Sequence, residues 1–305
     1  MTPEPDAVPV PDRRPVGPGV VRRLIAEQFP RWAHLPVRPV AVNGWDNQTF
    51  HLGDRMSVRL PTAREYALAV DKEHRWLPML AQHVPVPIPR PLAKGAPGAG
   101  FAFPWSVYEW IDGEPAGAGA IGDLTEFARR LAGFLGALQR IDPAGGPGPG
   151  LHNWFRGGPL QVYDAQARQA IDRLGGQVPR DAVLAVWRSA LEAPWDGRPV
   201  WFHGDVAVGN LLVRDGALAA VIDFGTCGVG DPACELAIAW TLLSGASREA
   251  FRAGLGVDAS TWRRGRGWAL WKALIDYGDP GAKRVVDEVL KDSLNREGGR
   301  GVVGS

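Results

Sequence analysis

The chain has 305 residues, of which 45% are hydrophobic and 22% are charged, and its 34 basic residues nearly balance its 33 acidic ones. This composition is typical of a folded globular protein with enough apolar side chains for one large domain or two ordinary ones. The net charge of +1 gives no electrostatic reason to expect a nucleic acid as partner, and no apolar run approaches the length of a membrane span.

The cysteine content and the N-terminus exclude two further classes of protein. The chain has two cysteines, Cys227 and Cys234, which are too few for a disulfide framework and lack the spacing of a zinc site. Residues 1–16 contain no apolar stretch of the signal-peptide kind. We therefore expect a cytoplasmic protein without a membrane segment, whose two thiols are reduced and serve as packing residues.

The first third of the chain predicts a small, strand-rich unit. Short apolar runs, separated by turn residues at Asn43-Gly44 and Gly53-Asp54, predict strands, and helical spacing predicts two helices. Four prolines between 85 and 91 predict a stiff, extended connection. The expected elements are a loose tail at 1–18, a helix at Val20–Phe29, strands at Val37–Val42, Asn47–Leu52 and Met56–Leu60, a helix at Glu65–Leu80 that Pro78 kinks or ends, and an aromatic strand at Phe101–Trp110.

The rest of the chain predicts a larger and mostly helical unit. The small residues, glycines and prolines of Ile111–Ala120 are typical of a hinge. Beyond it, apolar side chains recur at helical spacing from Leu124 to Ile141, after Asp123 as N-cap. Further helices are expected at 164–174, 181–192, 231–245, 261–276 and 282–294, and short apolar strand-like pieces at Val200–Phe202, Leu211–Val213 and Ala219–Ile222.

This order of elements predicts an α+β fold with two lobes. The strand-rich unit is expected at 19–111, the helical unit at 112–296, and a second loose tail at 297–305. The basic run at 263–266 is expected to be a solvated helix face. The tryptophans expected to pack in the core or between the lobes are Trp32, Trp76, Trp187, Trp195, Trp240, Trp262, Trp268 and Trp271.

Two polar loops carry the residue types that phosphoryl transfer needs. One runs from His203 to Asn210 between two apolar pieces, and the other begins at Asp223, directly after an apolar run. Phosphoryl transfer needs one carboxylate to orient the acceptor hydroxyl and take its proton, and oxygen ligands for the Mg²⁺ that bridges the phosphates. Asp205, Asn210 and Asp223 supply these groups at the spacing used in protein kinases.

Both loops resemble motifs of one enzyme family. His203-Gly204-Asp205 followed by Asn210 looks like the HGDxxxxN motif of the aminoglycoside phosphotransferase (phosphotransferase enzyme) family, a family of small-molecule kinases. The segment from Ile222-Asp223 through Gly230-Asp231 to Glu235-Leu236 looks like the second motif, with Glu235 where Asp is usual. The resemblance extends over residues 37–295 and implies a bilobal protein-kinase-like fold with a small strand-rich N-lobe and a larger helical C-lobe.

The resemblance implies a role for each matching residue. Asp205 is expected to be the catalytic base, Asn210 and Asp223 to bind Mg²⁺, and His203 and Asp231 to brace the two loops. The residues expected to bind the nucleotide, ATP with GTP as the alternative, are Asn47, Thr49, Arg59, Glu73, Tyr108, Glu109 and Trp110. The weaker candidates for contact with the acceptor are Trp154, Arg156, Asp276 and Asp279.

Arg59 is the clear departure from the family pattern, because many members have Lys at this position. Arginine is also a permanent cation, and its planar fork suits phosphate oxygens. Glu73 falls on the same helical stripe as Val70 and Leu77, so its carboxylate is expected to point inward, where it needs a cation. We therefore predict an Arg59–Glu73 ion pair.

The acceptor is expected to be a small hydroxylated molecule. An aminoglycoside is a polycation and favours an acidic site, but residues 258–305, where the family usually builds acceptor contacts, contain nine basic and seven acidic residues. A role in antibiotic resistance therefore stays open, beside macrolides, amino alcohols and sugars as acceptors.

Two other classes of function also stay open. The Arg59 departure favours a nucleotide-binding pseudoenzyme, whereas Asp205, Asn210 and Asp223 are all present and favour an enzyme. A protein kinase or regulatory module is disfavoured, because Gly230-Asp231-Pro232 follows the metal-binding loop directly. The chain is expected to be a monomer or a weak homodimer.

Overall fold

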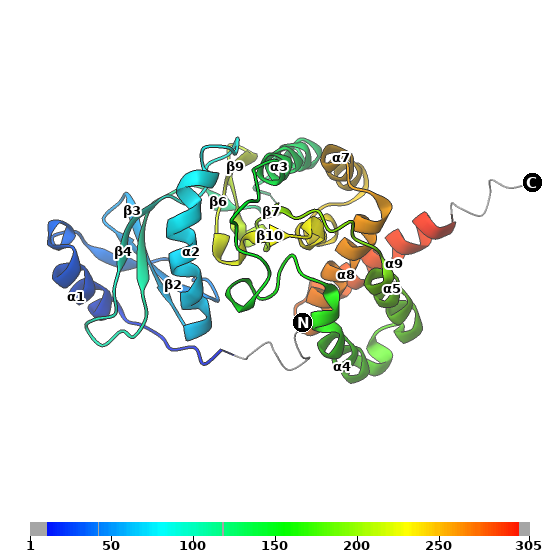
Figure 1. Ribbon diagram of the computed structural model, residues 1–305, viewed down its shortest axis with the longest axis horizontal. Coiled ribbons are helices and arrows are strands. Elements are labelled where there is room, and N and C mark those ends of the chain that lie inside the picture. The colour runs from blue at the N-terminus through cyan, green and yellow to red at the C-terminus, as the bar shows by residue number, and fades with distance from the viewer. Residues whose placement is uncertain (1–10, 42, 118, 299–305) are drawn as a thin grey trace, which may run out of the picture.

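The computed structural model describes residues 11–41, 43–117 and 119–298. Most of the two tails expected at 1–18 and 297–305 lies outside these residues, as does Val42 at the end of the first expected strand. The described part combines a strand-rich region with a helical region, as the α+β prediction requires (Figure 1). No helix in it is long and apolar enough to cross a bilayer.

The strand-rich region is one antiparallel sheet of five strands in the order β1-β2-β3-β5-β4. The three strands predicted between 37 and 60 are present, the predicted aromatic strand is shorter than expected, and β4 was not predicted. The strands are β1 (Val37–Pro39), β2 (Asn47–Leu52), β3 (Met56–Pro61), β4 (Pro91–Gly95) and β5 (Trp105–Glu109).

The two faces of this sheet have different partners because side chains alternate along each strand. Phe50, Val58 and Val107 are paired in register and form an apolar cluster with helix α1 (Pro18–Gln28). Thr49 and Arg59 are also paired in register and lie on the other face. Figure 1 shows α1 beyond one side of the sheet and helix α2 between the sheet and the rest of the molecule.

Helix α2 (Arg64–Leu80) belongs to both regions. Its buried Glu73 meets the sheet, whereas Leu77 and Leu80 pack in the main apolar cluster with Phe127 of α3. The helix continues for two residues past Pro78, which therefore lies in its last turn, so the helix ends close to where the proline predicts. The polar second face of the sheet and the helical region are thus joined through one helix.

The helical region contains the helices predicted from apolar spacing, with small sheets between them. Asp123 caps α3 as predicted, since its carboxylate accepts hydrogen bonds from the Thr125 and Glu126 N–H groups at 2.8 and 3.0 Å. The helices are α3 (Leu124–Gln139), α4 (Asp164–Leu174), α5 (Arg180–Glu192), α6 (Ile238–Thr241), α7 (Gly245–Leu255), α8 (Ala259–Ile275) and α9 (Ala282–Gly298). The strands are β6 (Glu114–Pro115), β7 (Val200–Phe202), β8 (Leu211–Arg214), β9 (Ala217–Val221) and β10 (Gly228–Gly230).

The single helix predicted at 231–245 is wrong. The structure has a 3-10 segment over Pro232–Ala237, the short α6, and then the separate helix α7. The buried Arg248 side chain donates to the carbonyls of Ala239 and Leu243, which satisfies the end of α6. Ser244, in extended conformation, starts α7 as its N-cap.

The basic run at 263–266 is not a solvated face, so this prediction is also wrong. Arg264 and Arg266 are buried, and Arg264 forms a two-nitrogen ion pair with buried Asp231 at 2.6 and 3.1 Å. Both arginines are tolerated inside because carboxylates meet them, Asp292 being 3.9 Å from Arg266. Because α8 is buried on all sides, its sequence has no single apolar stripe.

The aromatic and thiol predictions have mixed outcomes. Trp187, Trp240, Trp262 and Trp268 are among the largest fully buried side chains and Trp271 is 4% exposed, whereas Trp32 and Trp76 are half-buried. Trp195 is 39% exposed, which makes its assignment to the core wrong. Cys227 and Cys234 are buried free thiols. The boundaries predicted for the two lobes stay predictions.

Candidate active site

The loop from His203 to Asn210 is held at both ends by strands β7 and β8 and braced from behind by Glu235. The Glu235 carboxylate accepts hydrogen bonds from the His203 and Gly204 N–H groups at 3.0 and 2.8 Å. Its complete burial raises the pKa of Glu235 to about 7. A Cβ at Gly204, whose φ is +88°, would lie 2.6 Å from the Thr226 carbonyl oxygen, so glycine is required here.

The imidazole of His203 ties this loop to the second one. Nε2 lies 2.9 Å from the Ile222 carbonyl oxygen, and Nδ1 accepts from the Asp205 N–H at 3.1 Å. These partners require the tautomer with hydrogen on Nε2. Burial lowers the pKa of His203, which favours the neutral ring. His203 thus has the contacts expected of a bracing residue.

Asp205 and Asn210 are in direct contact. The Asn210 Nδ2 group donates to the Asp205 main-chain oxygen at 2.9 Å and to Oδ2 of its carboxylate at 3.1 Å. The amide orientation is set by these two bonds, which leave the Asn210 side-chain oxygen as an acceptor or a metal ligand. The structure therefore brings together two of the three groups predicted for phosphoryl transfer.

Asp223, the third group, follows β9 and is held by Arg59. Its backbone is left-handed, with φ of +65°, which is uncommon outside glycine and turns its side chain at the end of the strand. Arg59 Nη2 donates to Asp223 Oδ1 at 2.9 Å. The sequence did not predict this bond.

The predicted Arg59–Glu73 pair is present beside it. Arg59 Nη1 lies 3.8 Å from Glu73 Oε1, and the Tyr108 hydroxyl donates to Glu73 Oε2 at 2.7 Å. Burial opposes the charge of Arg59, but Asp223 and Glu73 outweigh it and raise the pKa of the guanidinium further. One arginine therefore links the sheet, α2 and the Asp223 loop.

Lys272 is a site residue that the sequence did not reveal. Its ammonium, on α8, lies 2.5 Å from Asp205 Oδ1. Burial alone would raise the pKa of Asp205, but the charges of Lys272 and Arg156 lower it to about 2. The only signal was compositional, because Lys272 is one of five lysines in a chain with 29 arginines.

Asp46 is the second residue missed. It lies in the turn before β2, where its main-chain oxygen accepts from the Thr62 N–H at 2.9 Å. Burial, together with the charges of Asp223 and Asp205, raises the pKa of Asp46 to about 7. Asn47 and Thr49, on the strand β2 that follows Asp46, lie on the same face of the sheet as Arg59. No contact among the described residues tests their expected role in binding a nucleotide.

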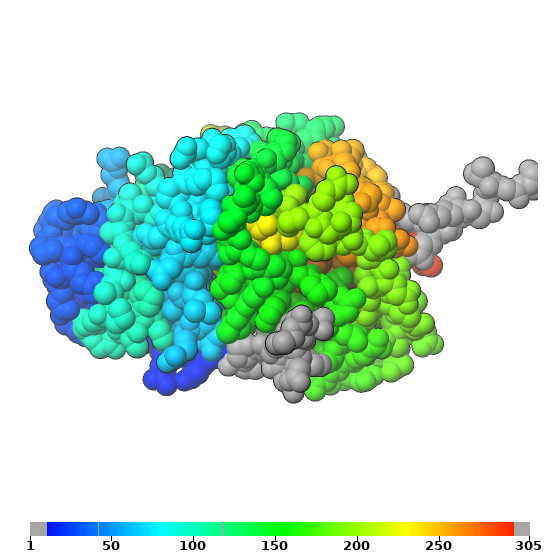
Figure 2. Space-filling view, in the orientation of Figure 1, coloured from blue at the N-terminus to red at the C-terminus, as the bar shows by residue number. Residues whose placement is uncertain are grey.

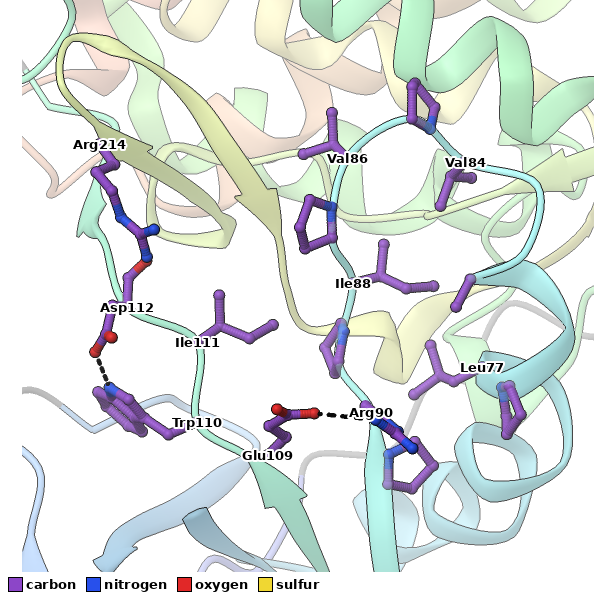
Figure 3. Close-up of a pocket in the computed structure, with 16 residues that line it drawn as sticks. Leu77, Val84, Val86, Ile88, Arg90, Glu109, Trp110, Ile111, Asp112 and Arg214 are labelled. Carbon is purple, nitrogen blue, oxygen red and sulfur yellow. Dashed lines mark hydrogen bonds and ion pairs between the residues drawn. The ribbon is translucent and has the colours of Figure 1, made fainter. Parts of the chain in front are cut away.

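Glu109 and Trp110 line a cavity of about 830 Å³ (Figure 3). Asp205, Asn210 and Asp223, which we call the Asp205 cluster, are not among the residues that line it. Figure 3 shows them facing the proline-rich connection 84–91, which carries Ile88, with Leu77 of α2 beyond it. The Glu109 carboxylate pairs with Arg90 at 3.6 Å, and the Trp110 indole donates to Asp112 at 2.8 Å. Their side chains are thus engaged away from the cluster.

Of the acceptor candidates, Arg156 lies near Asp205, and Asp276 follows Lys272 by one turn, since its N–H donates to the Lys272 main-chain oxygen at 3.3 Å. Trp154 contacts the Tyr66 ring of α2, with ring centroids 5.4 Å apart. Asp276 and Asp279 are exposed at and beyond the C-terminal end of α8. Figure 2 shows the green segment that contains residue 154 on the surface beside the cyan of α2.

The donor set fits a metal that arrives with a nucleotide. Among the described residues no group of three or more His, Cys, Asp or Glu side chains could hold a metal ion. Mg²⁺ bound with phosphates needs only one or two protein carboxylates and keeps several waters. Asp223 and the free amide oxygen of Asn210 suit such an ion, because one Asp223 oxygen remains beyond the Arg59 bond.

Comparisons with known proteins show the family and the fold of the chain. The model of the phosphotransferase enzyme family matches residues 36–268. No curated protein sequence matches the chain.

Solved structures of small-molecule kinases share the fold. The chain superposes on aminoglycoside phosphotransferase APH(2")-IIIa with GDP and kanamycin at 21% identity and a TM-score of 0.70, covering 90% of this chain and 98% of that one. A macrolide 2'-phosphotransferase from Brachybacterium faecium matches at 21% identity, a TM-score of 0.57 and coverage of 88% and 97%. The streptomycin–ATP complex of APH(2")-IIa matches at 16% identity, a TM-score of 0.59 and coverage of 90% and 99%. The predicted bilobal kinase-like fold is confirmed.

Proposed function

Because the chain belongs to the phosphotransferase enzyme family, we propose that it transfers the γ-phosphoryl group of ATP to a hydroxyl group of a small molecule. The observation that carries the proposal is the meeting of two loops beside Arg59: Asn210 bonds to Asp205 in one loop, and the N–H of Ile222, next to Asp223 in the other, donates to the Asn210 main-chain oxygen at 2.8 Å. GTP is the alternative donor, since solved relatives contain GDP, ADP or ATP.

Asp205 is the proposed catalytic base. It orients the acceptor hydroxyl and takes its proton while the acceptor oxygen forms a bond to the γ-phosphorus and the bond from that phosphorus to the β–γ bridging oxygen breaks. The Asn210 bond at 3.1 Å holds Oδ2, and Oδ1, which also accepts a hydrogen bond from Lys272, is the oxygen proposed to face the acceptor. A positioned base of this kind contributes about a hundredfold or more to the rate.

Asn210, Asp223 and Arg59 are the proposed phosphate-side residues. Asp223 and Asn210 would hold Mg²⁺, which supplies charge neutralisation on the phosphates when bound. Arg59, kept charged and oriented by Glu73, would bind phosphate oxygens. His203 and Asp231 keep their proposed bracing roles, which their contacts with Ile222 and Arg264 support.

The other nucleotide contacts are proposed for the remaining predicted residues. Asn47 and Thr49 share the sheet face of Arg59, which supports a place above the phosphates. At Tyr108–Trp110 we propose that main-chain groups contact the base, since the side chains have other partners. We also propose lobes at 19–111 and 112–296, a monomer or weak homodimer, and a cytoplasmic location.

The test is a nucleotide-turnover assay with ATP or GTP against aminoglycosides, macrolides, amino alcohols and sugars. We expect at least one acceptor to be phosphorylated, and Asp205→Asn to lower turnover about a hundredfold or more while nucleotide binding persists. Full turnover by the Asp205→Asn variant would refute the proposed base. Tight nucleotide binding without turnover by the wild-type chain would identify a pseudoenzyme instead.

A further inference from the structure

We propose that Lys272 and Arg156 form an anion-binding subsite beside Asp205, so that the acceptor is a hydroxylated small molecule carrying a carboxylate or a phosphate. The inference rests on the function proposed above and names its substrate class. It follows from the charges that the helical region places next to the acceptor-side oxygen of Asp205.

Lys272 occupies the side of Asp205 that faces away from Asn210. Asn210 donates to Oδ2, whereas the Lys272 ammonium lies 2.5 Å from Oδ1. An ammonium has three N–H donors. Among the described residues, Asp205 is the one hydrogen-bond partner of the Lys272 ammonium. Its side chain is 24% exposed, so the other two donors can reach a bound molecule.

Arg156 supplies a second cation in the same corner. Its guanidinium lies over the Trp271 ring, 4.7 Å from the centroid, and Trp271 precedes Lys272 on α8. The residue is only 9% exposed, and its Nε has no hydrogen-bond partner in the described part of the chain. Aromatic rings compensate a buried cation only in part. Nη1 donates to the Tyr163 hydroxyl at 3.3 Å, and the guanidinium charge, which acts on Asp205 together with that of Lys272, attracts an anion bound in this corner.

The backbone before Arg156 is held in an unusual conformation that positions it. Trp154 and Phe155 are consecutive non-glycine residues, each with φ of +53°. The Tyr163 hydroxyl donates to the Trp154 carbonyl oxygen, and the Phe155 N–H donates to the Gly150 oxygen at 2.8 Å. Such strain persists where the surrounding structure imposes it, which is common around ligand sites.

These charges favour an anionic acceptor over a cationic one. A polycation would meet Lys272 and Arg156 beside the hydroxyl-accepting oxygen, and the two aspartates that could attract it, Asp276 and Asp279, are exposed at and beyond the end of α8. A carboxylate or phosphate bound to the Lys272 ammonium would instead bring a neighbouring hydroxyl to Asp205. Lys272 then bridges the base and the acceptor.

Binding of charge-matched probes tests the proposal. With the enzyme saturated by magnesium and a non-hydrolysable ATP analogue, gluconate and glucose 6-phosphate are compared with glucose and glucosamine, and short hydroxy acids with their amides and amino alcohols. We expect the tightest anionic probe to bind about tenfold better than its neutral or amine counterpart, as one half-buried charge pair allows. Tightest binding by an amine, or no binding by any anionic probe, overturns the proposal.

Variants separate the subsite from a structural effect. Lys272→Met should erase the preference for anions and Lys272→Arg should keep it, whereas Lys291→Met removes an exposed lysine of α9 and should change nothing. For an anionic acceptor, Lys272→Met should raise KM about tenfold with a smaller change in kcat. An equal loss for neutral and anionic acceptors would mean a structural role and end the proposal.

The two proposals fail in different ways. Asp205-dependent phosphorylation of neutral or cationic acceptors alone would keep the kinase and refute the anionic subsite. Anion binding that depends on Lys272, without any Asp205-dependent turnover, would keep the subsite and refute the kinase.

Discussion

Arg59 illustrates how one side chain can serve two carboxylates, the buried Glu73 and the partly exposed Asp223. Its two terminal nitrogens meet different carboxylates, Asp223 at 2.9 Å and Glu73 at 3.8 Å. A lysine ammonium is a single point charge on a flexible stem, so it cannot span both carboxylates with a fixed fork. Arginine at position 59 therefore ties Asp223 to Glu73 through one planar group.

Removal of this cation should destabilise the fold. Arg59→Met would leave Glu73, whose side chain is 6% exposed, without a counter-charge, so we expect a loss of about 3–5 kcal/mol in the free energy of unfolding. Arg59→Lys should lose clearly less. Denaturant unfolding measures both, with Arg38→Met as control, since the Arg38–Asp54 pair is exposed and worth at most about 1 kcal/mol. Equal losses for Arg59→Met and Arg38→Met would contradict this account.

The buried Glu235 should make stability depend on pH. Burial raises its pKa from an ordinary 4.5 to about 7, so between these values the folded state holds a proton that the unfolded state has released. This residue's contribution therefore falls as the pH rises from about 4.5 to about 7, by about 3 kcal/mol in total. Glu235→Gln should flatten that fall when the free energies of unfolding at pH 5 and pH 7.5 are compared. Exposed Glu114→Gln is the control, and parallel curves for wild type and Glu235→Gln would refute the explanation.

At the scale of single residues, the sequence predicts site residues whose partners lie close along the chain. It misses site residues whose partners lie far along the chain. Asp205 and Asn210 share one loop, and Glu73 is marked by an apolar stripe on its own helix. Lys272 reaches Asp205 from 67 residues further along, and nothing near it in the sequence indicates that contact. Asp46 directly precedes the expected site residue Asn47, but its raised pKa arises from burial and from the charges of Asp223 and Asp205 on other elements, which the sequence does not show.

Among the elements, both α3 and α8 are present where helices were predicted, but the solvent-facing side was predicted correctly only for the half-exposed α3. α3 has one apolar face and one polar face, so its spacing and its Asp123 cap define it from the sequence. α8 is buried on all sides, so its arginines resemble surface residues until Asp231 is placed beside Arg264. The short strands β6 and β10 depend on pairing with β8 and β7, which no local pattern specifies.

The ion pair between α8 and the segment after β10 should couple the two elements strongly. Arg264→Met would leave Asp231 buried and unpaired, and we expect a loss of about 3–5 kcal/mol in the free energy of unfolding. Asp231→Asn keeps the side-chain oxygen that caps the Ala233 N–H, so the double variant should be more stable than the sum of the single effects predicts. Denaturant unfolding of all four proteins forms the double-mutant cycle. Additive losses would show that the pair is not an energetic unit, and Arg180→Met, at an exposed pair, serves as control.

Across the whole molecule, two consecutive residues of α2 connect the sheet to the helical region. Glu73 meets Arg59 and Tyr108 of the sheet, whereas buried Lys72 donates to the main-chain oxygens of Gly225 and Cys227 at 2.7 and 3.0 Å. The sequence predicted two lobes and their order through the resemblance. It did not predict how α2 joins them, because Lys72 binds main-chain oxygens that lie 80 to 155 residues further along the chain, at His152, Gly225 and Cys227.

A nucleotide should stabilise the molecule through this junction, since the proposed phosphate-side residues come from both regions. At one hundred times its Kd, magnesium ATP should add about 2.7 kcal/mol of stability, which corresponds to a rise in Tm of about 5 °C for a chain of this size. EDTA should remove most of that rise, because the phosphates would then face Asp223 and Asp205 without a metal ion. Asp223→Asn should reduce the rise in Tm as well. Asp54→Asn, at an exposed aspartate in the turn between β2 and β3, should leave the rise intact. Thermal unfolding followed by fluorescence measures all of these, and a rise that is indifferent to EDTA and to Asp223→Asn would place the nucleotide elsewhere.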